Sequence, residues 1–358
     1  MRTRIVWPGV CLALCAVGSV PAFAQRNRKN TEPKTQVLPL PPELPMALAA
    51  ETKELDFHIS PLLHTGGLAA QIRQSLTDLI RDTHGETIIK LRAFVAGAGD
   101  ARRVQAVVAE LFTERRLPLP VLTILQVGSL GDQTAQVIIE AIVSTHRMVN
   151  PNGLAFLAGQ TGATLKASLE RLSASARAAS ITPERVLTCT CFTSRMEDHA
   201  SAQAIIRAAF PNSAVNVVEA LRDPVNDATT CEAIGQLSAA ATARPVIWLK
   251  RSRVAMVTSE RLVFTGLQLT FGSYLDDAHE AFARLQRAAA ALQPVEAPVE
   301  VNAFPLNIYA GSALRKSTSV PASVFTVQTV EGLPSADASA GIEAVMAPNV
   351  PSPVSLPD

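Results

Sequence analysis

The chain of 358 residues has few aromatic and charged side chains, which make up only 4% and 18% of it. Because it contains two Trp, two Tyr and 12 Phe, a core of any size must be packed mainly from Ala, Val, Leu and Ile. The net charge of +1 gives no basic excess, so we expect no nucleic-acid partner. No P-loop, dinucleotide fingerprint or zinc-ligand spacing occurs, so we expect no cofactor and no metal site.

Long apolar runs are also missing, apart from one near the N-terminus. There, Arg2 and Arg4 precede an apolar run that contains Pro8, and an A-x-A pattern ends at Ala24. This order is typical of a secretory signal peptide over residues 1–24. The alternative is a membrane anchor, but the run is shorter than the roughly 20 residues that a span needs. We therefore expect a secreted or periplasmic protein with no membrane association after cleavage.

Three cysteines remain after such a cleavage: Cys189, Cys191 and Cys231. An odd number in an oxidising compartment permits one disulfide and one free thiol, while buried packing is the more ordinary role for Cys in strands. The sequence leaves open whether a disulfide forms. We expect no thiol chemistry, because no base near these residues can be identified.

Two β-branched runs lie on either side of the turn-forming segment Gly128-Ser129-Leu130-Gly131-Asp132. These runs, Val121–Val127 and 135–143, predict two neighbouring strands joined by a short connection. Upstream lie a helix-period run over 101–114 and an apolar run over 87–95. The order helix, strand, helix, strand, strand then recurs twice, although the second helix of the third copy is degraded.

The same Glu-Ala pair occurs in the closing strand of each copy, at Glu140, Glu232 and Glu343. A charged residue at one place in three apolar strands supports an internal repeat. We predict three similar domains, at 49–147, 148–243 and 244–348. We expect disorder in the Pro-rich lead-in, 25–48, and in the tail, 349–358.

Three kinds of motif carry a family resemblance. The first copy has Ala70-Gln71-Ile72-Arg73-Gln74 at the start of a predicted helix. The second has Phe156-Leu157-Ala158-Gly159-Gln160, and the third has the looser Phe264-Thr265-Gly266-Leu267-Gln268. With the three Glu-Ala pairs, these segments resemble the A-Q-T-R-Q, F-x-S-G-Q and V-E-I-E-A motifs of the Rid family, the YjgF-like enamine/imine deaminases. The resemblance covers nearly all of 49–348.

The resemblance implies an α+β fold of three chorismate-mutase-like units, each a mixed sheet with two helices on one face. In the family, three subunits cover their sheets by forming a trimer around a central barrel, with clefts between subunits. Three units on one chain would then form an intramolecular pseudo-trimer, and the protein would be a monomer.

The resemblance also implies site residues. Active Rid deaminases hold the substrate carboxylate with an Arg at the start of the strand before the turn, and a Glu on the next strand positions water. Glu140, Glu232 and Glu343 match this Glu and are candidate catalytic residues; hydrogen bonding to the backbone is the alternative. The Arg position falls at Leu122 in the first copy, at about Val324 in the third, and near Ser213 or Ala214 in the second. An apolar residue cannot bind a carboxylate, so the usual substrate should bind poorly.

Other cleft positions depart from the family as well. Gln105 and Gln203 stand in place of an Asn of the second helix. Arg92 and Arg222 could bind an anion instead, although a solvated charge at a strand end is the ordinary interpretation. We expect a Rid-like scaffold that binds a small molecule or a protein in clefts between repeats. The alternative is an enamine/imine deaminase or related hydrolase acting on a substrate without a carboxylate. The sequence leaves the ligand and the functional cleft open.

Overall fold

The computed structural model describes residues 42–97, 100–196, 198–239, 244–294, 297–317, 320–321 and 324–348. All of them belong to the unit Pro41–Asp358. The expected signal peptide, 1–24, and the expected tail, 349–358, lie outside the described residues, as does most of the expected lead-in. Disorder does not extend to the end of that lead-in, because β1 (Ala47–Glu51) begins within it and pairs with β12 (Arg261–Thr265).

The first sheet has the strand order β2-β5-β3-β4. Its strands are β2 (Leu55–Ile59), β5 (Val137–Ser144), β3 (Thr87–Ala96) and β4 (Val121–Val127). It packs against α1 (Leu68–Asp82) and α2 (Arg102–Glu114). The helical spacing of Ile72, Leu76 and Leu79 explains why α1 forms, because all three side chains are buried on one side of the helix.

The second sheet has the order β10-β11-β6-β9-β7-β8. Its strands are β10 (Val246–Leu249), β11 (Val254–Val257), β6 (Leu154–Gly162), β9 (Thr229–Gln236), β7 (Val186–Thr193) and β8 (Ala214–Glu219). Its helices are α3 (Leu165–Ala178), whose first turn is capped by the Thr164 hydroxyl, and α4 (His199–Ala209). A disulfide joins Cys191 on β7 to Cys231 on β9. Cys189 is a free, buried thiol, and burial raises its pKa.

The third sheet has the order β1-β12-β16-β14-β15, with β13 also paired to β16. Its further strands are β16 (Ala340–Ala347), β14 (Ala297–Pro305), β15 (Phe325–Val327) and β13 (Gln268–Thr270). Its helices are α5 (Leu275–Ala290) and α6 (Ile308–Ser317). The expectation of a degraded second helix in the third copy is wrong, because α6 runs for ten residues and buries Ala310, Ala313 and Leu314.

The described part of the chain is therefore an α+β structure with three mixed sheets and six α-helices. Four strands have the same order in each sheet: β2-β5-β3-β4, β6-β9-β7-β8 and β12-β16-β14-β15. In each set the last pair is parallel and the others are antiparallel. Two short 3-10 helices, Thr52–Glu54 and Pro183–Arg185, complete the regular elements.

The prediction that β4 and β5 are neighbours is wrong. The parallel strand β3 lies between them, and β8 and β9 are separated by β7 in the same way. Two apolar runs joined by a short turn look like a hairpin in the sequence. Here, however, β4 arrives beside β3 through the crossover helix α2, so β5 has to add on the opposite side of β3.

Two segments pair outside the repeat to which the sequence assigned them. The hairpin of β10 and β11 opens the predicted third domain, 244–348, but β11 pairs with β6 of the second sheet. Similarly, β1 pairs with β12 of the third sheet. Each segment thus ties one repeat to another by backbone hydrogen bonds.

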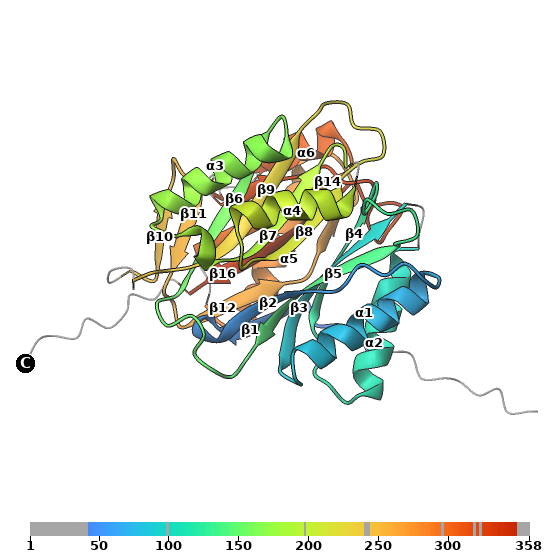
Figure 1. Ribbon diagram of the computed structural model, residues 1–358, viewed down its shortest axis with the longest axis horizontal. Coiled ribbons are helices and arrows are strands. Elements are labelled where there is room, and N and C mark those ends of the chain that lie inside the picture. The colour runs from blue at the N-terminus through green and yellow to red at the C-terminus, as the bar shows by residue number, and fades with distance from the viewer. Residues whose placement is uncertain are drawn as a thin grey trace, which may run out of the picture. The chain divides into compact units, whose positions relative to one another are not determined.

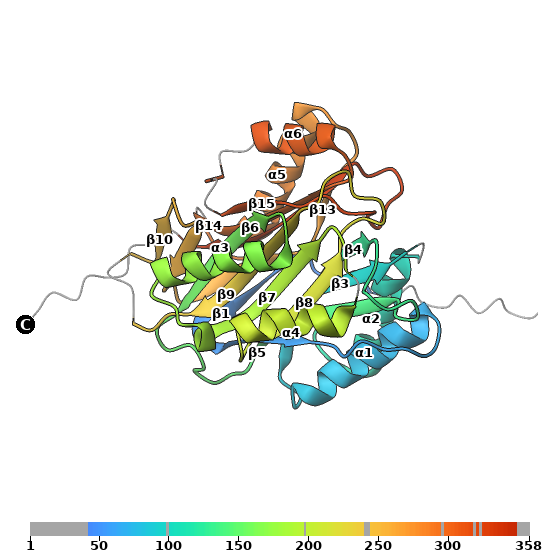
Figure 2. The same cartoon turned by 45° about the horizontal axis from the view of Figure 1, so that its top comes forward.

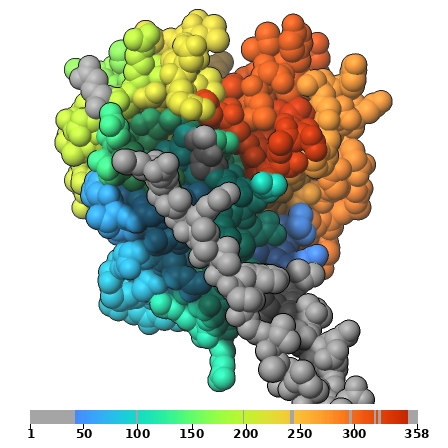
Figure 3. All heavy atoms as spheres, turned by 90° about the vertical axis from the view of Figure 1, so that its right-hand side faces the viewer, coloured from blue at the N-terminus to red at the C-terminus, as the bar shows by residue number. Residues whose placement is uncertain are grey.

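Contacts between the sheets follow a cyclic order. Strand β2 contacts β8 of the second sheet, β6 contacts β15 of the third, and β12 contacts β4 of the first. The strands form three separate open sheets and no continuous closed barrel among the described residues. Figure 1 and Figure 2 show the helices of the first two repeats on the outer faces of their sheets, and Figure 3 shows segments of all three repeats adjoining on one face.

Equivalent side chains from the three sheets pack together between them. Phe94, Phe192 and Phe304 form one such group, with ring centroids 5.9 Å and 6.3 Å apart in successive pairs. Phe57, Phe156 and Phe264 lie together in a second apolar cluster. The polar residues described next lie on the central strands between these two groups.

Candidate functional site

The three central strands carry polar residues at equivalent positions, opposite the three repeated glutamates. Strand pairing places Arg92 on β3 opposite Glu140 on β5. It places Thr190 opposite Glu232 in the second sheet and Asn302 opposite Glu343 in the third. All six belong to what we call the central cluster, together with Lys90, Thr123, Asn216 and Glu300.

Glu140 is bound by the second sheet. Its Oε1 accepts hydrogen bonds from Thr190 Oγ1 at 2.6 Å and from Asn216 Nδ2 at 2.7 Å. Its Oε2 lies 3.4 Å from Nη1 of Arg92. Two neutral donors from another sheet therefore hold a carboxylate whose side chain is only 14% exposed.

Glu343 is bound by the first sheet. It accepts hydrogen bonds from the Arg92 guanidinium and from the Thr123 hydroxyl, and its Oε2 lies 2.7 Å from Lys90 Nζ. Although burial opposes ionisation, Arg92 and Lys90 lower the pKa of Glu343 to about 2. This fully buried carboxylate is therefore ionised at neutral pH.

Glu232 completes the cyclic pattern. Its Oε1 accepts a hydrogen bond of 2.7 Å from Arg92 Nη1. With its amide suitably oriented, Asn302 of the third sheet donates to Glu232 Oε2 at 3.2 Å and accepts from Arg92 Nη2 at 2.9 Å. Burial raises the pKa of Glu232, while Arg92 acts against that shift. Burial alone would lower the pKa of Arg92, but Glu343, Glu232 and Glu140 hold it well above its usual value.

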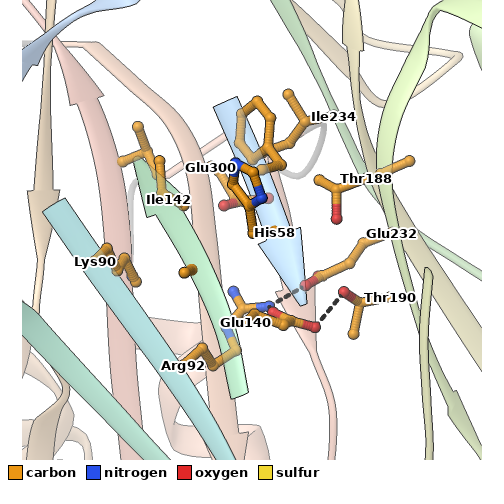
Figure 4. A pocket seen from close by; sticks show the side chains of 14 residues that line it. His58, Lys90, Arg92, Glu140, Ile142, Thr188, Thr190, Glu232, Ile234 and Glu300 are labelled. Atoms are coloured by element: carbon orange, nitrogen blue, oxygen red, sulfur yellow. Dashed lines mark hydrogen bonds and ion pairs between the residues drawn. The ribbon is translucent and has the colours of Figure 1, made fainter. Parts of the chain in front are cut away.

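A small cavity adjoins the cluster and leaves about 50 Å³ for the centres of water molecules. Its polar wall includes His58, Thr188 and Glu300, and its apolar wall includes Ile142 and Ile234 (Figure 4). Burial and the neighbouring carboxylate of Glu232 raise the pKa of Glu300 to about 8. Glu300 is therefore mostly protonated at neutral pH. The buried His58 Nε2 atom lies 3.3 Å from Asp56 Oδ2, and this contact lowers the pKa of Asp56.

The structure brings four of the expected site residues together, in an unexpected place. Glu140, Glu232, Glu343 and Arg92 meet between the three sheets, and all but Glu343 line the central cavity. The expectation that Arg92 is a solvated strand-end charge is wrong, because the residue is 8% exposed and contacts three carboxylates. The alternative of backbone partners for the glutamates is also wrong for the contacts described, since side chains hold them.

Leu122 and Gln105 lie together in a different place, a cavity of about 160 Å³ between the first and third repeats. The other described walls of this first cleft are apolar or backbone, among them Met46, Ile124 and Leu267. Strand pairing identifies the equivalents of Leu122 as Val215 and Phe325, so the expected positions near 213–214 and 324 were one or two residues early.

Two further expected residues lie apart from the cluster. Gln203 Nε2 is 3.5 Å from the carbonyl oxygen of Val215, beside the equivalent of Leu122. Arg222 follows β8 on the surface, where its Nη2 lies 2.8 Å from Glu331 Oε1. It therefore joins the second and third repeats by an exposed ion pair.

A second cleft lies between the second and third repeats and has a volume of about 360 Å³. Phe325, the equivalent of Leu122, lines it, and so does Gly159 of the F-L-A-G-Q motif. Two arginines, Arg253 and Arg315, also face it. No sequence pattern identified these two residues, because neither lies at the position where the resemblance placed a carboxylate-binding Arg.

Sequence reasoning also missed the rest of the central cluster, although a signal was present. The three central strands read Lys90-Leu91-Arg92-Ala93-Phe94, Thr188-Cys189-Thr190-Cys191-Phe192 and Glu300-Val301-Asn302-Ala303-Phe304. Each has two polar residues followed by Phe at every second position, which marks one face of a strand. Among the described residues, no group of three or more His, Cys, Asp or Glu side chains is arranged to hold a metal ion.

Comparison with known proteins shows distant structural similarity. No family model matches the sequence, and no curated protein matches it significantly. The chain is similar to a chorismatase, with 11% identity over 86% of this chain and 80% of that one, at a TM-score of 0.37. It is also similar to the cyanuric acid hydrolase of A. caulinodans, with 12% identity over 85% and 100%, at a TM-score of 0.21. A protein of unknown function from Agrobacterium tumefaciens, Atu1372, has 17% identity over 27% and 81%, at a TM-score of 0.19. Since these TM-scores are below 0.5, we infer no function from these similarities and use the geometry of the site instead.

Proposed function

We propose that the chain is a Rid-like scaffold that binds a small molecule in a cleft between repeats and lacks the family's usual deaminase activity. The main observation that supports this proposal is that side chains of neighbouring sheets already bind all three repeated glutamates. Donors from the protein lower the pKa of Glu343 to about 2, which makes this carboxylate a poor base, and Glu140 and Glu232 already accept hydrogen bonds from protein side chains. The central cavity has room for only a few water molecules, so it cannot hold a substrate as well.

We further propose that the three repeats, 49–147, 148–243 and 244–348, form an intramolecular pseudo-trimer. The shared strand order and the cyclic contacts between sheets support this arrangement. Because the inner face of each sheet is covered by the other two, the chain needs no second copy to bury it. We expect a monomer in solution, and sedimentation equilibrium that gives three chain masses would contradict the proposal.

The proposed location is outside the cytoplasm, in the periplasm or medium. The disulfide between Cys191 and Cys231 supports it, because disulfides persist in oxidising compartments. Among the residues described, no helix is both long and apolar enough to cross a membrane.

An assay with 2-iminopropionate, the simplest carboxylate-bearing imine, tests the missing activity. We expect no turnover by the wild-type protein, because Leu122, Val215 and Phe325 cannot bind the substrate carboxylate. Leu122→Arg should create measurable deamination only if the first cleft still resembles the family's active site. Turnover by the wild-type protein that Glu140→Gln abolishes would overturn the proposal.

A second candidate function is hydrolysis of an imine or related substrate that has no carboxylate. It is favoured by the cavity that His58 lines together with Glu140 and Glu300, because the His58 ring also contacts a carboxylate, with Nε2 at 3.3 Å from Asp56 Oδ2. This function would require the cavity to enlarge when substrate binds. Turnover of a neutral imine that is lost in both His58→Gln and Glu140→Gln would favour it over the scaffold.

A further inference from the structure

We propose that the second cleft, between β6 and β15, binds a small organic carboxylate with an apolar body through Arg253 and Arg315. This inference rests on the proposed function and assigns a ligand class to one of its clefts. It adds to the expectation that the usual substrate binds poorly where Leu122 and its equivalents replace the Arg that holds a carboxylate. The guanidinium groups come from other elements than the strand that carries the family's Arg.

Arg253 reaches the cleft because of an unusual strand connection. It ends the turn between β10 and β11 with φ at 57°, and β11 pairs with β6 of the second sheet. From there its Nη2 donates a hydrogen bond of 2.8 Å to the carbonyl oxygen of Phe325 on β15. One side chain therefore spans the cleft from the second sheet to the third.

The Arg253 guanidinium lacks a counter-charge. It forms no ion pair with any described carboxylate, and its Nε atom is buried with no hydrogen-bond partner in the described structure. Burial lowers the pKa of Arg253, because surroundings with little water disfavour the charged form. A partly desolvated guanidinium with free donors is stabilised when a carboxylate binds its planar edge.

The other residues that line the cleft suit both the carboxylate and the apolar body of such a ligand. Arg315, in the last turn of α6, is exposed and adds a second positive charge. Three hydroxyls line the cleft, at Thr161, Thr230 and Thr326. Thr326 accepts a hydrogen bond of 2.8 Å from Gly159 N–H, so its own hydroxyl hydrogen is available to donate.

Apolar side chains occupy the rest of the cleft. Phe325 and Val327 line it, and its volume of about 360 Å³ lies within the usual range for small-molecule sites. Inorganic anions would leave this apolar surface unused. The first cleft offers a contrast, because none of its described walls is charged. The geometry therefore favours an acid with an apolar body, and favours the second cleft for it.

Titration of the full mature chain with benzoate tests the assignment, with calorimetry as the measurement. Benzamide, a neutral molecule of the same shape, and inorganic phosphate are titrated in parallel. We expect benzoate to bind, benzamide not to bind, and phosphate to compete only weakly. Arg253→Gln should weaken benzoate binding about tenfold or more, because it removes a charge-assisted hydrogen bond.

Arg251→Gln is the matched control, since Arg251 is an exposed residue of the same turn, and it should leave benzoate binding unchanged. If Arg253→Gln fails to fold, the exposed Arg315→Gln replaces it and should also weaken binding. Absence of benzoate binding, equal binding of benzamide, equal competition by phosphate, or no effect of either substitution would overturn the inference. Failure of the proposed function is measured separately, as turnover of 2-iminopropionate, which none of these binding measurements reports.

Discussion

Glu140 of the first sheet accepts a hydrogen bond of 2.6 Å from Thr190 of the second sheet, 50 residues further along the chain. Glu343 of the third sheet is bound in the same way by Thr123 of the first. Each glutamate thus reaches across to the sheet that follows its own in the cyclic order. The three repeated glutamates, which the family resemblance makes candidate catalytic residues, connect the three sheets to one another.

Arg92 is the residue on which these connections depend most, because it contacts all three glutamates. Arg92→Met keeps the volume but leaves buried carboxylates without their main counter-charge. We expect the free energy of unfolding to fall by roughly 3–5 kcal/mol, the usual effect of breaking a buried ion pair from one side. Urea denaturation followed by circular dichroism measures it.

Arg222→Ala provides the control for Arg92→Met. Arg222 is also paired with a glutamate, Glu331, but its side chain is 56% exposed. An exposed ion pair contributes only about 0–1 kcal/mol. If the two variants lost the same free energy of unfolding, Arg92 in the central cluster would contribute no more to stability than an exposed ion pair does.

Glu300 should make the stability of the protein fall as the pH rises. Its pKa of about 8 in the folded state lies above the ordinary 4.5, so the folded protein keeps a proton that the unfolded chain releases. The unfavourable contribution therefore grows between pH 4.5 and about 8 and is constant above that. Glu300→Gln removes the titration and should be more stable than the wild-type protein at pH 8, by on the order of 1–3 kcal/mol.

Thermal unfolding at a series of pH values measures this difference. Glu170→Gln, at an exposed position of α3, is the control and should leave the pH profile unchanged. Should Glu300→Gln and wild-type protein have parallel profiles between pH 4 and 9, the carboxyl of Glu300 is not the titrating group.

The sequence predicted the helices and strands well, because their apolar periods are local properties. Helix α2, for example, was predicted over 101–114 and occupies Arg102–Glu114. The pairing of the strands was harder to predict from the sequence. The partner of β11 is β6, almost a hundred residues earlier, and no local pattern in the sequence of β11 specifies that choice.

The central cluster was only half predictable for a related reason. The three glutamates could be found because they repeat in sequence. Their partners Arg92, Thr190 and Asn302 hold one structural position with three different residue types, so a search for a shared residue misses them. The three residue types are explained only by the assembled sheets, in which each of these side chains contacts a glutamate of another sheet.

The disulfide between Cys191 and Cys231 gives a third prediction. It links two adjacent strands and closes a loop of 40 residues, so removing it should cost about 2–4 kcal/mol. We expect the melting temperature of the wild-type protein to fall in dithiothreitol, and that of the double variant Cys191→Ala/Cys231→Ala to be insensitive to it. Mass spectrometry of the mature chain, 25–358, after alkylation should find one modified thiol, at Cys189, and only once the protein is unfolded.

Cys189→Ala is the control for that measurement. It removes a buried thiol but no crosslink, so its melting temperature should still respond to dithiothreitol. An absence of any response in the wild-type protein would mean that the pair is reduced in the protein as isolated.

Gly159 gives the last prediction, which concerns the contact between the second and third sheets. A Cβ atom at this position would lie 2.6 Å from Thr326 Cγ2 and 2.7 Å from Thr230 Cγ2, closer than two carbons can approach. Gly159→Ala should therefore push β15 away from β6 and lower the free energy of unfolding by about 1–3 kcal/mol. It should also weaken benzoate binding, because Thr326 helps to form the cleft.

Gly67→Ala is the control, since a Cβ there meets nothing within 4 Å, and neither stability nor binding should change by much. If Gly159→Ala were as stable as the wild-type protein, the two sheets would not be in the close contact on which the second cleft depends.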